Sequence, residues 1–355
     1  MTACGGGSAR SYNSTNTANG DTIELGIDNP ICQDGSATFE GKVTDSQTKK
    51  AINNVNISID GCTTKTDENG YYKLSNILSK GRTPVAFRKD GYYPNSEIID
   101  HNNNTSNYLE FSFDAYESSE EISFDSEDGI SKNNIEVSDT SKYTNIETGK
   151  KYSGNIKSNF FYKNTFDSNN KNFLPGNYQG INADGVVATF VTYGFMVIEF
   201  KDTENNNLNI SETITFSVDN IQGTQDETIS LWYYNYNRGM WIEKGLAYRD
   251  DKGNYVCEID QAGTWSLSAP IETEMALYRG YIIDENNNPI TNVRINAIGE
   301  NWITKDLSTN ENGLFEIYVV PEKSFKISAY NYKDKYGANY ENTISPIPIG
   351  QVIEE

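Results

Sequence analysis

The side chains that most often do chemistry are few in this chain, and they are scattered along it. The only histidine is His101, in the polar run His101-Asn-Asn-Asn-Thr105. A histidine-rich zinc site is therefore excluded, and a Ser-His-Asp triad would have to be built around this one residue. Because the run is polar, we expect a solvated side chain at His101 rather than a general base.

Carboxylates are abundant: Asp and Glu total 50 against 29 Lys and Arg, giving a formal net charge of -21. This charge argues against nucleic-acid binding and against electrostatic docking to anionic lipid, since both need a basic face. No motif singles out a carboxylate pair for glycoside hydrolysis. The loop Asp125-Ser-Glu-Asp-Gly129 offers Asp125, Glu127 and Asp128 as weak calcium candidates, spaced unlike an EF-hand. We expect no other metal site and no small-molecule cofactor.

Aromatic residues concentrate in the run Leu231-Trp-Tyr-Tyr-Asn-Tyr-Asn-Arg-Gly-Met-Trp241. Asn237-Arg-Gly239 predicts a turn between two aromatic strands. Sugars stack on exposed aromatic faces, so the run supplies candidate ligand-facing residues, as does one tryptophan nearer the C-terminus. These candidates are Trp232, Tyr234, Tyr236, Trp241 and Trp302. The alternative is packing inside a core or between sheets; Tyr236, at the hairpin tip, is expected to be the most exposed.

The N-terminal residues Met1-Thr-Ala-Cys4 resemble the end of a bacterial lipoprotein signal peptide, where small residues precede the Cys that is lipidated. The polar tract that follows, to about Asp28, is typical of a flexible tether. The resemblance implies an exported protein whose lipid anchor holds it on a membrane. We expect the bacterial outer membrane, with the globular part exposed at the surface. The alternative is a free Cys in an unstructured tail.

Export permits disulfide bonds. Cys32 lies just before the first predicted strand and Cys62 begins the third, so the two are candidates for a bridge. The alternative is that they are two separate small hydrophobic residues. Cys257, in Tyr255-Val-Cys-Glu-Ile259, is expected to be a strand residue on its own.

Composition indicates an all-β protein of two or three domains. Strand-forming residues dominate, turn-forming residues cluster between them, and 24 Tyr with 15 Phe can supply cores. No apolar run approaches the roughly 18 residues needed to span a bilayer.

One pattern occurs twice, over residues 39–74 and again over residues 278–317. Its order is Gly-x-(Val/Ile)-x-Asp, a turn, Ile-x-x-Val-x-Ile, and then Asn-Gly-(Tyr/Leu)-(Tyr/Phe), which indicates a repeated folding unit. Strands are predicted in the first copy at Thr38–Val43, Val55–Ile59, Cys62–Thr66, Tyr71–Leu74, Val85–Arg88, Glu97–Ile99 and Tyr108–Phe113. In the second they are predicted at Tyr278–Ile283, Val293–Ile298, Leu314–Val319 and Phe325–Tyr330.

The first copy resembles the carboxypeptidase regulatory-like domain, a transthyretin-like β-sandwich. The resemblance is carried by Gly41, Val43, Asp45, Ile52, Val55, Ile57, Thr66, Asp67, Gly70, Tyr71, Tyr72 and the turn Lys89-Asp90-Gly91-Tyr92. The second copy keeps Gly280, Ile282, Asp284, Pro289, Val293, Ile295 and Gly313. The resemblance implies an accessory module, and a metallocarboxypeptidase is excluded because its zinc site needs more than one His.

The middle of the chain resembles a β-module of bacterial surface proteins that also occurs in cartilage intermediate layer protein. The matching residues are Pro175, Gly176, Asn177, Gly194, Met196, Leu231, Trp232, Tyr233, Tyr234, Gly239, Trp241, Glu243 and Gly245. This resemblance implies no catalytic residues.

We therefore expect tandem antiparallel β-sandwich domains, transthyretin-like or Ig-like, behind a flexible N-terminal tether. The predicted divisions are a lipidated tether (1–34), a first sandwich (35–115), a middle module (116–273) and a second sandwich (274–355). The expected function is non-catalytic: a structural or adhesive lipoprotein of the cell envelope, with a protein or glycan partner. The alternative is a carbohydrate-binding lipoprotein that captures glycans on aromatic surface residues.

Overall fold

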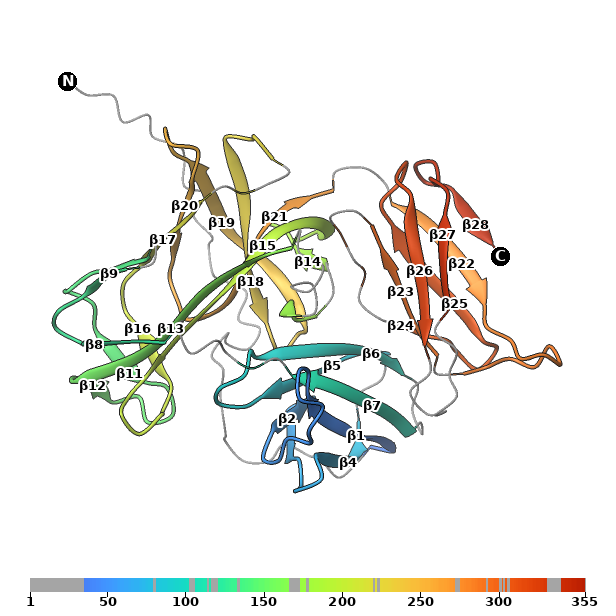
Figure 1. Ribbon diagram of the computed structural model, residues 1–355, viewed down its shortest axis with the longest axis horizontal. Coiled ribbons are helices and arrows are strands. Elements are labelled where there is room, and N and C mark those ends of the chain that lie inside the picture. The colour runs from blue at the N-terminus through green and yellow to red at the C-terminus, as the bar shows by residue number, and fades with distance from the viewer. Residues whose placement is uncertain are drawn as a thin grey trace.

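The computed structural model confirms the all-β prediction. It describes residues 35–354 except 79–80, 102–105, 114, 116–120, 133–134, 166–172, 177–178, 220, 222–223, 272–274, 292, 300–301, 303, 305–306 and 331–339. In this part of the chain the regular elements are strands, β1 to β28, and none is an α-helix (Figure 1). Accordingly, no described segment is a helix long and apolar enough to cross a membrane.

The first sandwich consists of two sheets. One has the order β4-β1-β7, in which β1 pairs antiparallel with β4 and parallel with β7. The other has the order β3-β2-β5-β6. The strands are β1 (Ala37–Asp45), β2 (Asn56–Ile59), β3 (Cys62–Lys65), β4 (Tyr71–Ile77), β5 (Gly81–Arg88), β6 (Asn95–His101) and β7 (Ser106–Phe113). All seven predicted strands are confirmed, and several are longer than predicted.

Alternation of side chains builds the core of this sandwich. In β1 every second residue from Ala37 to Asp45 is buried, and Phe39 and Val43 face the opposite sheet. Phe87 of β5 meets them from the other side and stacks on Phe111 with the ring centroids 4.3 Å apart. The outward residues of β5 are therefore left to contact another part of the molecule.

The C-terminal sandwich repeats this topology strand for strand. Its sheets have the orders β25-β22-β28 and β24-β23-β26-β27, with β22 antiparallel to β25 and parallel to β28. The strands are β22 (Ala276–Tyr281), β23 (Arg294–Ile298), β24 (Leu307–Ser308), β25 (Leu314–Val319), β26 (Phe325–Tyr330), β27 (Tyr340–Ile344) and β28 (Val352–Glu354). The four predicted strands are confirmed; β24, β27 and β28 were not predicted.

The two copies also share their turn chemistry. The buried Thr66 hydroxyl donates to the Ile52 carbonyl (2.7 Å) and accepts from the Val55 N–H (2.9 Å). In the second copy the Thr309 hydroxyl donates to the Ile290 carbonyl (2.8 Å) and accepts from the Val293 N–H (3.0 Å).

A glycine closes the following turn in each copy. Gly70 has φ of 76° and its carbonyl accepts from the Val43 N–H, while Gly313 has φ of 72° and accepts from Ile282. The glycines are required because both φ values lie in the left-handed region and a Cβ would come within 2.4 Å of a carbonyl oxygen, that of Val43 or of Ile282.

The middle module is a large curved sheet with a small one beside it. The large sheet runs β8-β13-β15-β21-β18-β19-β20-β17-β10-β9, with β14 paired to β15 and β19; the small one runs β12-β11-β16. The strands are β8 (Glu121–Asp125), β9 (Ile130–Lys132), β10 (Ile135–Val137), β11 (Tyr143–Asn145), β12 (Lys151–Tyr152), β13 (Asn155–Asn164), β14 (Gln179–Ile181), β15 (Val187–Lys201), β16 (Leu208–Ile210), β17 (Ile214–Val218), β18 (Thr228–Asn235), β19 (Met240–Arg249), β20 (Tyr255–Ile259) and β21 (Gly263–Pro270).

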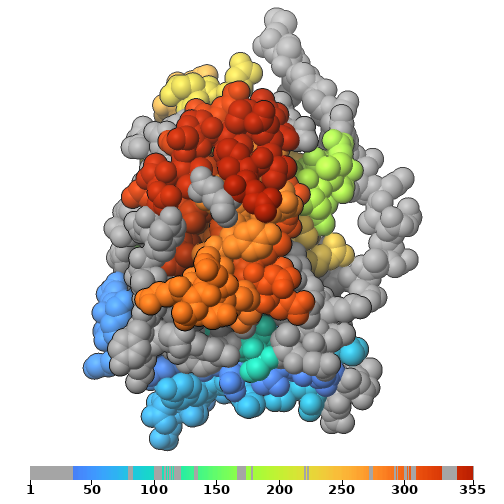
Figure 2. Space-filling view, turned by 90° about the vertical axis from the view of Figure 1, so that its right-hand side faces the viewer, coloured from blue at the N-terminus to red at the C-terminus, as the bar shows by residue number. Residues whose placement is uncertain are grey.

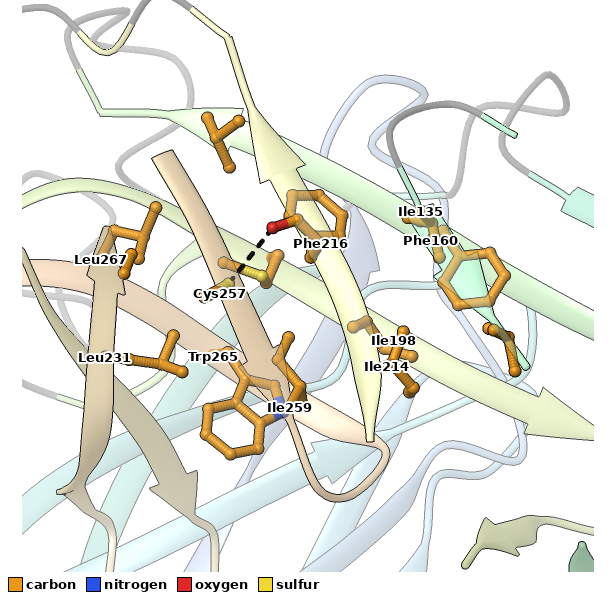
Figure 3. Packing of buried hydrophobic residues seen from close by; sticks show 14 of the residues in the cluster. Ile135, Phe160, Ile198, Ile214, Phe216, Leu231, Cys257, Ile259, Trp265 and Leu267 are labelled. Atoms are coloured by element: carbon orange, nitrogen blue, oxygen red, sulfur yellow. Dashed lines mark hydrogen bonds between the residues drawn. The ribbon is translucent and has the colours of Figure 1, made fainter. Parts of the chain in front are cut away.

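Strands far apart in this order share one core, so the large sheet folds back on itself. Ile135 of β10 and Phe160 of β13 lie in the same buried cluster as Leu231 and Trp265 (Figure 3). Cys257 lies in that core as a free, buried thiol, and its Sγ donates to the Phe216 carbonyl at 3.6 Å. Burial raises the pKa of this thiol to about 12. Cys257 is therefore the isolated strand residue that the sequence predicts.

Candidate functional site at the junction of two domains

The aromatic hairpin is formed by β18 and β19, joined by the predicted turn, in which Gly239 has φ of 59°. Alternation along β18 places Leu231 and Tyr233 in the core of the middle module. Trp232 and Tyr234 face the other way and join Trp241 of β19 in a second cluster. The exposed fractions of Trp232, Tyr234 and Trp241 are all 0%. The prediction that they face a ligand is wrong, and the packing alternative is correct for them.

These aromatics belong to a buried cluster to which both domains contribute. We call their cluster the junction cluster: Ala86 and Tyr93 of the first sandwich with Phe161, Leu174, Phe190, Phe195, Val197, Trp232, Tyr234, Tyr236 and Trp241 of the middle module. The Tyr93 ring lies edge-on to Phe161, with centroids 4.1 Å apart, and to Phe173 at 4.9 Å. In Figure 1 the sheet that contains β5 and β6 lies directly below β14 and β18.

Tyr236 holds the two domains together, although the sequence predicts that it is the most exposed of these aromatics. Its side chain is 8% exposed, and its hydroxyl donates to the Pro94 carbonyl at 3.0 Å. The same hydroxyl shares a 2.9 Å hydrogen bond with Thr264. The Arg88 guanidinium lies 4.4 Å from the centre of the Tyr236 ring. Burial raises the pKa of the Tyr236 hydroxyl, which therefore stays protonated and able to donate.

Polar contacts border the apolar junction. Lys201 of β15 forms an ion pair with Asp90 of the first sandwich at 2.6 Å, and Glu199 lies 3.9 Å from the same ammonium group. Burial acts to lower the pKa of Lys201, but the Glu199 and Asp90 carboxylates outweigh it and raise the pKa. The Gly176 N–H donates to the Ser96 carbonyl across the junction at 2.9 Å.

A pocket of about 370 Å³ opens beside these contacts, between the first sandwich and the middle module. The first sandwich supplies its polar wall, which includes Asn54, Asn56, Lys65, Arg88 and Lys89. Strand pairing explains the grouping, because Asn56 of β2 is opposite Lys65 of β3 on one side and Arg88 of β5 on the other. The middle module supplies a mainly apolar floor formed by Ile146, Ile198, Phe200, Leu208 and Ala262. Charge and apolar surface thus meet in one concavity.

Trp302 is also buried, so its predicted exposure is wrong. It is 4% exposed in the core of the C-terminal sandwich, and its ring centroid lies 5.9 Å from that of Phe325. Gly299 donates to the Trp302 carbonyl, and a Cβ on that glycine would lie 2.0 Å from the indole nitrogen. The indole therefore folds over a glycine and fills the end of the sandwich.

The remaining predicted sites are placed only in part. Cys62 is disulfide-bonded. Cys32 lies outside the described residues, so its pairing with Cys62 stays a prediction, and Cys4 lies outside them as well. His101 is the last residue of β6 and pairs with Gly81.

The acidic loop after β8 uses its first carboxylate for the turn itself. Asp125 accepts a hydrogen bond from the Glu127 N–H at 3.0 Å, and Asp125, Glu127 and Asp128 are all exposed. Across the described ranges, no three His, Cys, Asp or Glu side chains are grouped so that they could hold a metal ion. This geometry gives no support to calcium binding at the loop.

Comparisons with known proteins return only distant likenesses. No family model matches the chain, and no curated protein matches it. Among solved structures, the TIE protein of Bacillus anthracis is 11% identical with a TM-score of 0.21; the match covers 90% of this chain and 50% of that one. The chain therefore spans half the length of that protein.

Two further structures are similar over most of both chains. BcpA, the major pilin subunit of Bacillus cereus, is 9% identical with a TM-score of 0.19, and the match covers 90% of this chain and 97% of that one. A candidate carbohydrate-binding protein from Bacteroides uniformis is 11% identical with a TM-score of 0.19, covering 89% and 97%. At these TM-scores the likenesses say nothing about function.

Proposed function

We propose that this chain is a non-catalytic lipoprotein of the bacterial cell envelope with a structural and adhesive role at the cell surface. The observation that carries the proposal is the junction cluster, which joins the first sandwich to the middle module through a continuous apolar core. Domains joined in this way hold a fixed relative orientation. A protein of this kind is suited to hold a binding surface away from the membrane.

Several features support the finer assignment. The shared topology of β1–β7 and β22–β28 supports two carboxypeptidase regulatory-like domains, one on each side of the surface-protein module. Within the described residues, the sheets of each unit contain no strand from another, which agrees with divisions near residues 115 and 273. The lipid anchor on Cys4, and with it an outer-membrane location, rests on the N-terminal sequence.

Glycan capture on exposed aromatic faces finds no support, because the five candidate aromatics are buried. If this protein binds a glycan, it must use another surface.

Protease treatment of intact cells tests the proposed location. The protein would be expressed behind a lipoprotein signal peptide, beside the variant Cys4→Ala. We expect cleavage of the native protein on whole cells, and release of the variant from the membrane fraction. Protection from protease until the envelope is opened would contradict the surface location, and retention of Cys4→Ala in the membrane fraction would contradict the lipid anchor.

A further inference from the structure

We propose that the pocket at the junction binds an acidic saccharide, a sugar chain whose residues carry carboxylates. This inference rests on the proposed adhesive function and gives it a ligand class and a site. It does not use the aromatic residues of the hairpin as a binding surface, since these are buried in the junction cluster.

Charge is the first argument. The chain carries a net charge of -21, yet the pocket is lined by four cations, Lys65, Arg88, Lys89 and Lys201, against two carboxylates. Both carboxylates, Asp90 and Glu199, lie within 4 Å of the Lys201 ammonium. Lys65 and Lys89 form no ion pair with any residue of the described ranges, so the wall from the first sandwich presents positive charge that no described carboxylate neutralises. An anion can therefore be attracted here and repelled by most of the remaining surface.

The position of the cations is fixed by the fold. The pairing of Asn56 with Lys65 and with Arg88 places these three residues in one row across three strands. Arg88 is held further by its contact with the Tyr236 ring. Lys89 follows Arg88 directly, and its carbonyl accepts from the Tyr92 N–H at 3.1 Å in the turn after β5. A guanidinium held in place in this way can bind a carboxylate through two parallel hydrogen bonds.

The polar neutral groups favour a sugar as the carrier of the carboxylate. Asn54 and Asn56 line the pocket from the first sandwich and Asn207 from the middle module, and each amide can both donate to and accept from hydroxyl groups. Asn54 has φ of 52°, and its N–H donates to the Thr66 carbonyl, so the backbone that carries this amide is fixed. Amides contributed by both domains suit a ligand that carries several hydroxyl groups.

The floor and the size agree with this ligand. Ile146 and Ala262 are partly exposed and give the floor an apolar surface, against which the carbon–hydrogen face of a sugar ring can pack; Ile198, Phe200 and Leu208 lie behind them in the core. A volume of about 370 Å³ lies at the small end of the roughly 300–1,000 Å³ typical of ligand pockets, which suits a short segment of a chain. An acidic peptide is the competing ligand. An extended peptide is usually bound through hydrogen bonds to free backbone groups, whereas the polar groups that line this pocket are side chains.

Titration calorimetry with the whole chain tests the inference. The probes are tetragalacturonic acid, the neutral tetrasaccharide maltotetraose, and a tetra-glutamate peptide, at 50 mM and 300 mM salt. The test variant is Lys65→Gln with Lys89→Gln, because both residues line the pocket and neither has an ion-pair partner among the described residues. The matched control is Lys142→Gln with Lys151→Gln, which removes the same charge from two residues of the middle module that do not line the pocket.

We expect tetragalacturonic acid to bind the native protein and the control, and to bind at least about tenfold more weakly to the test variant. Affinity should fall at the higher salt because the attraction is partly screened. Any one of four results would overturn the proposal: no binding of the acidic saccharide, equal binding to the test variant, equal binding of maltotetraose, or tighter binding of the peptide. The last would make the ligand a protein segment.

These results are independent of the cell-surface experiment. Failure to bind the saccharide in a protein that is cleaved on whole cells would remove the ligand and leave the proposed location intact. Binding of the saccharide by a protein that is protected from protease on whole cells would remove the proposed location and leave the ligand intact.

Discussion

The first and last sandwiches share a topology but use their outer faces differently. In the first, the outward side chains of β5 and β6 are covered by the middle module: Ala86 joins the junction cluster, and Ile98 lies where a Cβ on Gly239 would meet it at 2.6 Å. In the C-terminal sandwich, the position equivalent to Ala86 is Ser328, which is half-exposed. The C-terminal sandwich occupies the front of Figure 2, above the first.

On the other outer faces, those of the three-stranded sheets, both copies carry ion pairs, but the C-terminal copy also carries an apolar row. The sheet β4-β1-β7 carries polar pairs, such as Glu40 with Lys73 at 3.2 Å. On β25-β22-β28, Leu277 lies between Tyr318 and Val352, and these last two are more than half exposed. The inward residues of the repeat thus determine the fold, while the outward residues are free to differ. Two copies of one domain therefore need not have one function.

The largest effect is expected from Ala86→Glu, which would place an unpaired carboxylate in the junction cluster. An unpaired buried charge costs roughly 3–5 kcal/mol, so we expect the first sandwich to separate from the middle module. In calorimetry the two should then unfold in separate transitions. Ser328→Glu is the matched control and should change stability by less than about 0.5 kcal/mol. Equal effects of the two variants would contradict the contrast.

Gly70→Ala and Gly313→Ala should each destabilise their own sandwich by more than about 2 kcal/mol, because left-handed backbone strain of about 1–2 kcal/mol is joined by the clash with a carbonyl oxygen. Gly91→Ala provides the control, since Gly91 has φ of 83° but no atom within 4 Å of the added Cβ. In urea denaturation, Gly91→Ala should lower the free energy of unfolding clearly less than the other two substitutions do. A cost at Gly313 no larger than that at Gly91 would indicate that the second turn is built differently.

Thr66→Val and Thr309→Val should lower the free energy of unfolding by similar amounts, roughly 1–3 kcal/mol each. Each substitution removes two hydrogen bonds of the hydroxyl and leaves the N–H of Val55 or of Val293 without its partner. Thr→Ser at each position keeps the hydroxyl and should recover most of the loss. The measurement is the free energy of unfolding in urea. A large difference between the two Thr→Val variants would break the equivalence of the repeats.

Acid should weaken both sandwiches through equivalent aspartates. Hydrogen bonds from the Thr48 N–H and hydroxyl lower the pKa of Asp45 although burial opposes them, and bonds from the Asn288 side chain and N–H lower that of Asp284. Because each folded pKa lies below the unfolded value of about 3.9, this stability is present above about pH 4 and is lost as pH falls through the lowered pKa. The free energy of unfolding, measured at pH 5, 4 and 3, should fall less steeply with acid in Asp45→Asn than in the native protein. No change in the slope would contradict the assignment.

The smallest effects should come from the ion pairs on the outer faces. Glu40→Gln and Arg279→Gln each remove exposed pairs, Glu40 with Lys73 and Arg279 with Glu316 and Glu354. Each should change the free energy of unfolding by less than about 1 kcal/mol, since exposed pairs are well solvated. A larger loss in either would mean that an outer face helps to stabilise its sandwich.

The sequence predicts well the residues that face the core within each sandwich. Residues of the repeat, such as Val55, Thr66 and Gly70, act within one sandwich, so their spacing along the chain reflects their contacts. The junction could not be predicted in this way, because Tyr236 contacts Pro94 and Arg88, which belong to a domain more than a hundred residues earlier in the chain. One signal was available: Tyr193-Gly-Phe-Met-Val-Ile-Glu-Phe200 is a nearly continuous apolar run, which is typical of a strand buried on both faces.

The central claim is that the first sandwich and the middle module form one rigid unit through the junction cluster. A pulsed electron–electron distance measurement tests it most directly, with spin-labelled non-natural residues at the exposed positions Lys73 and Lys151. We predict a single narrow distance distribution for the native protein and a broad one for Ala86→Glu. A broad distribution in the native protein would contradict the claim.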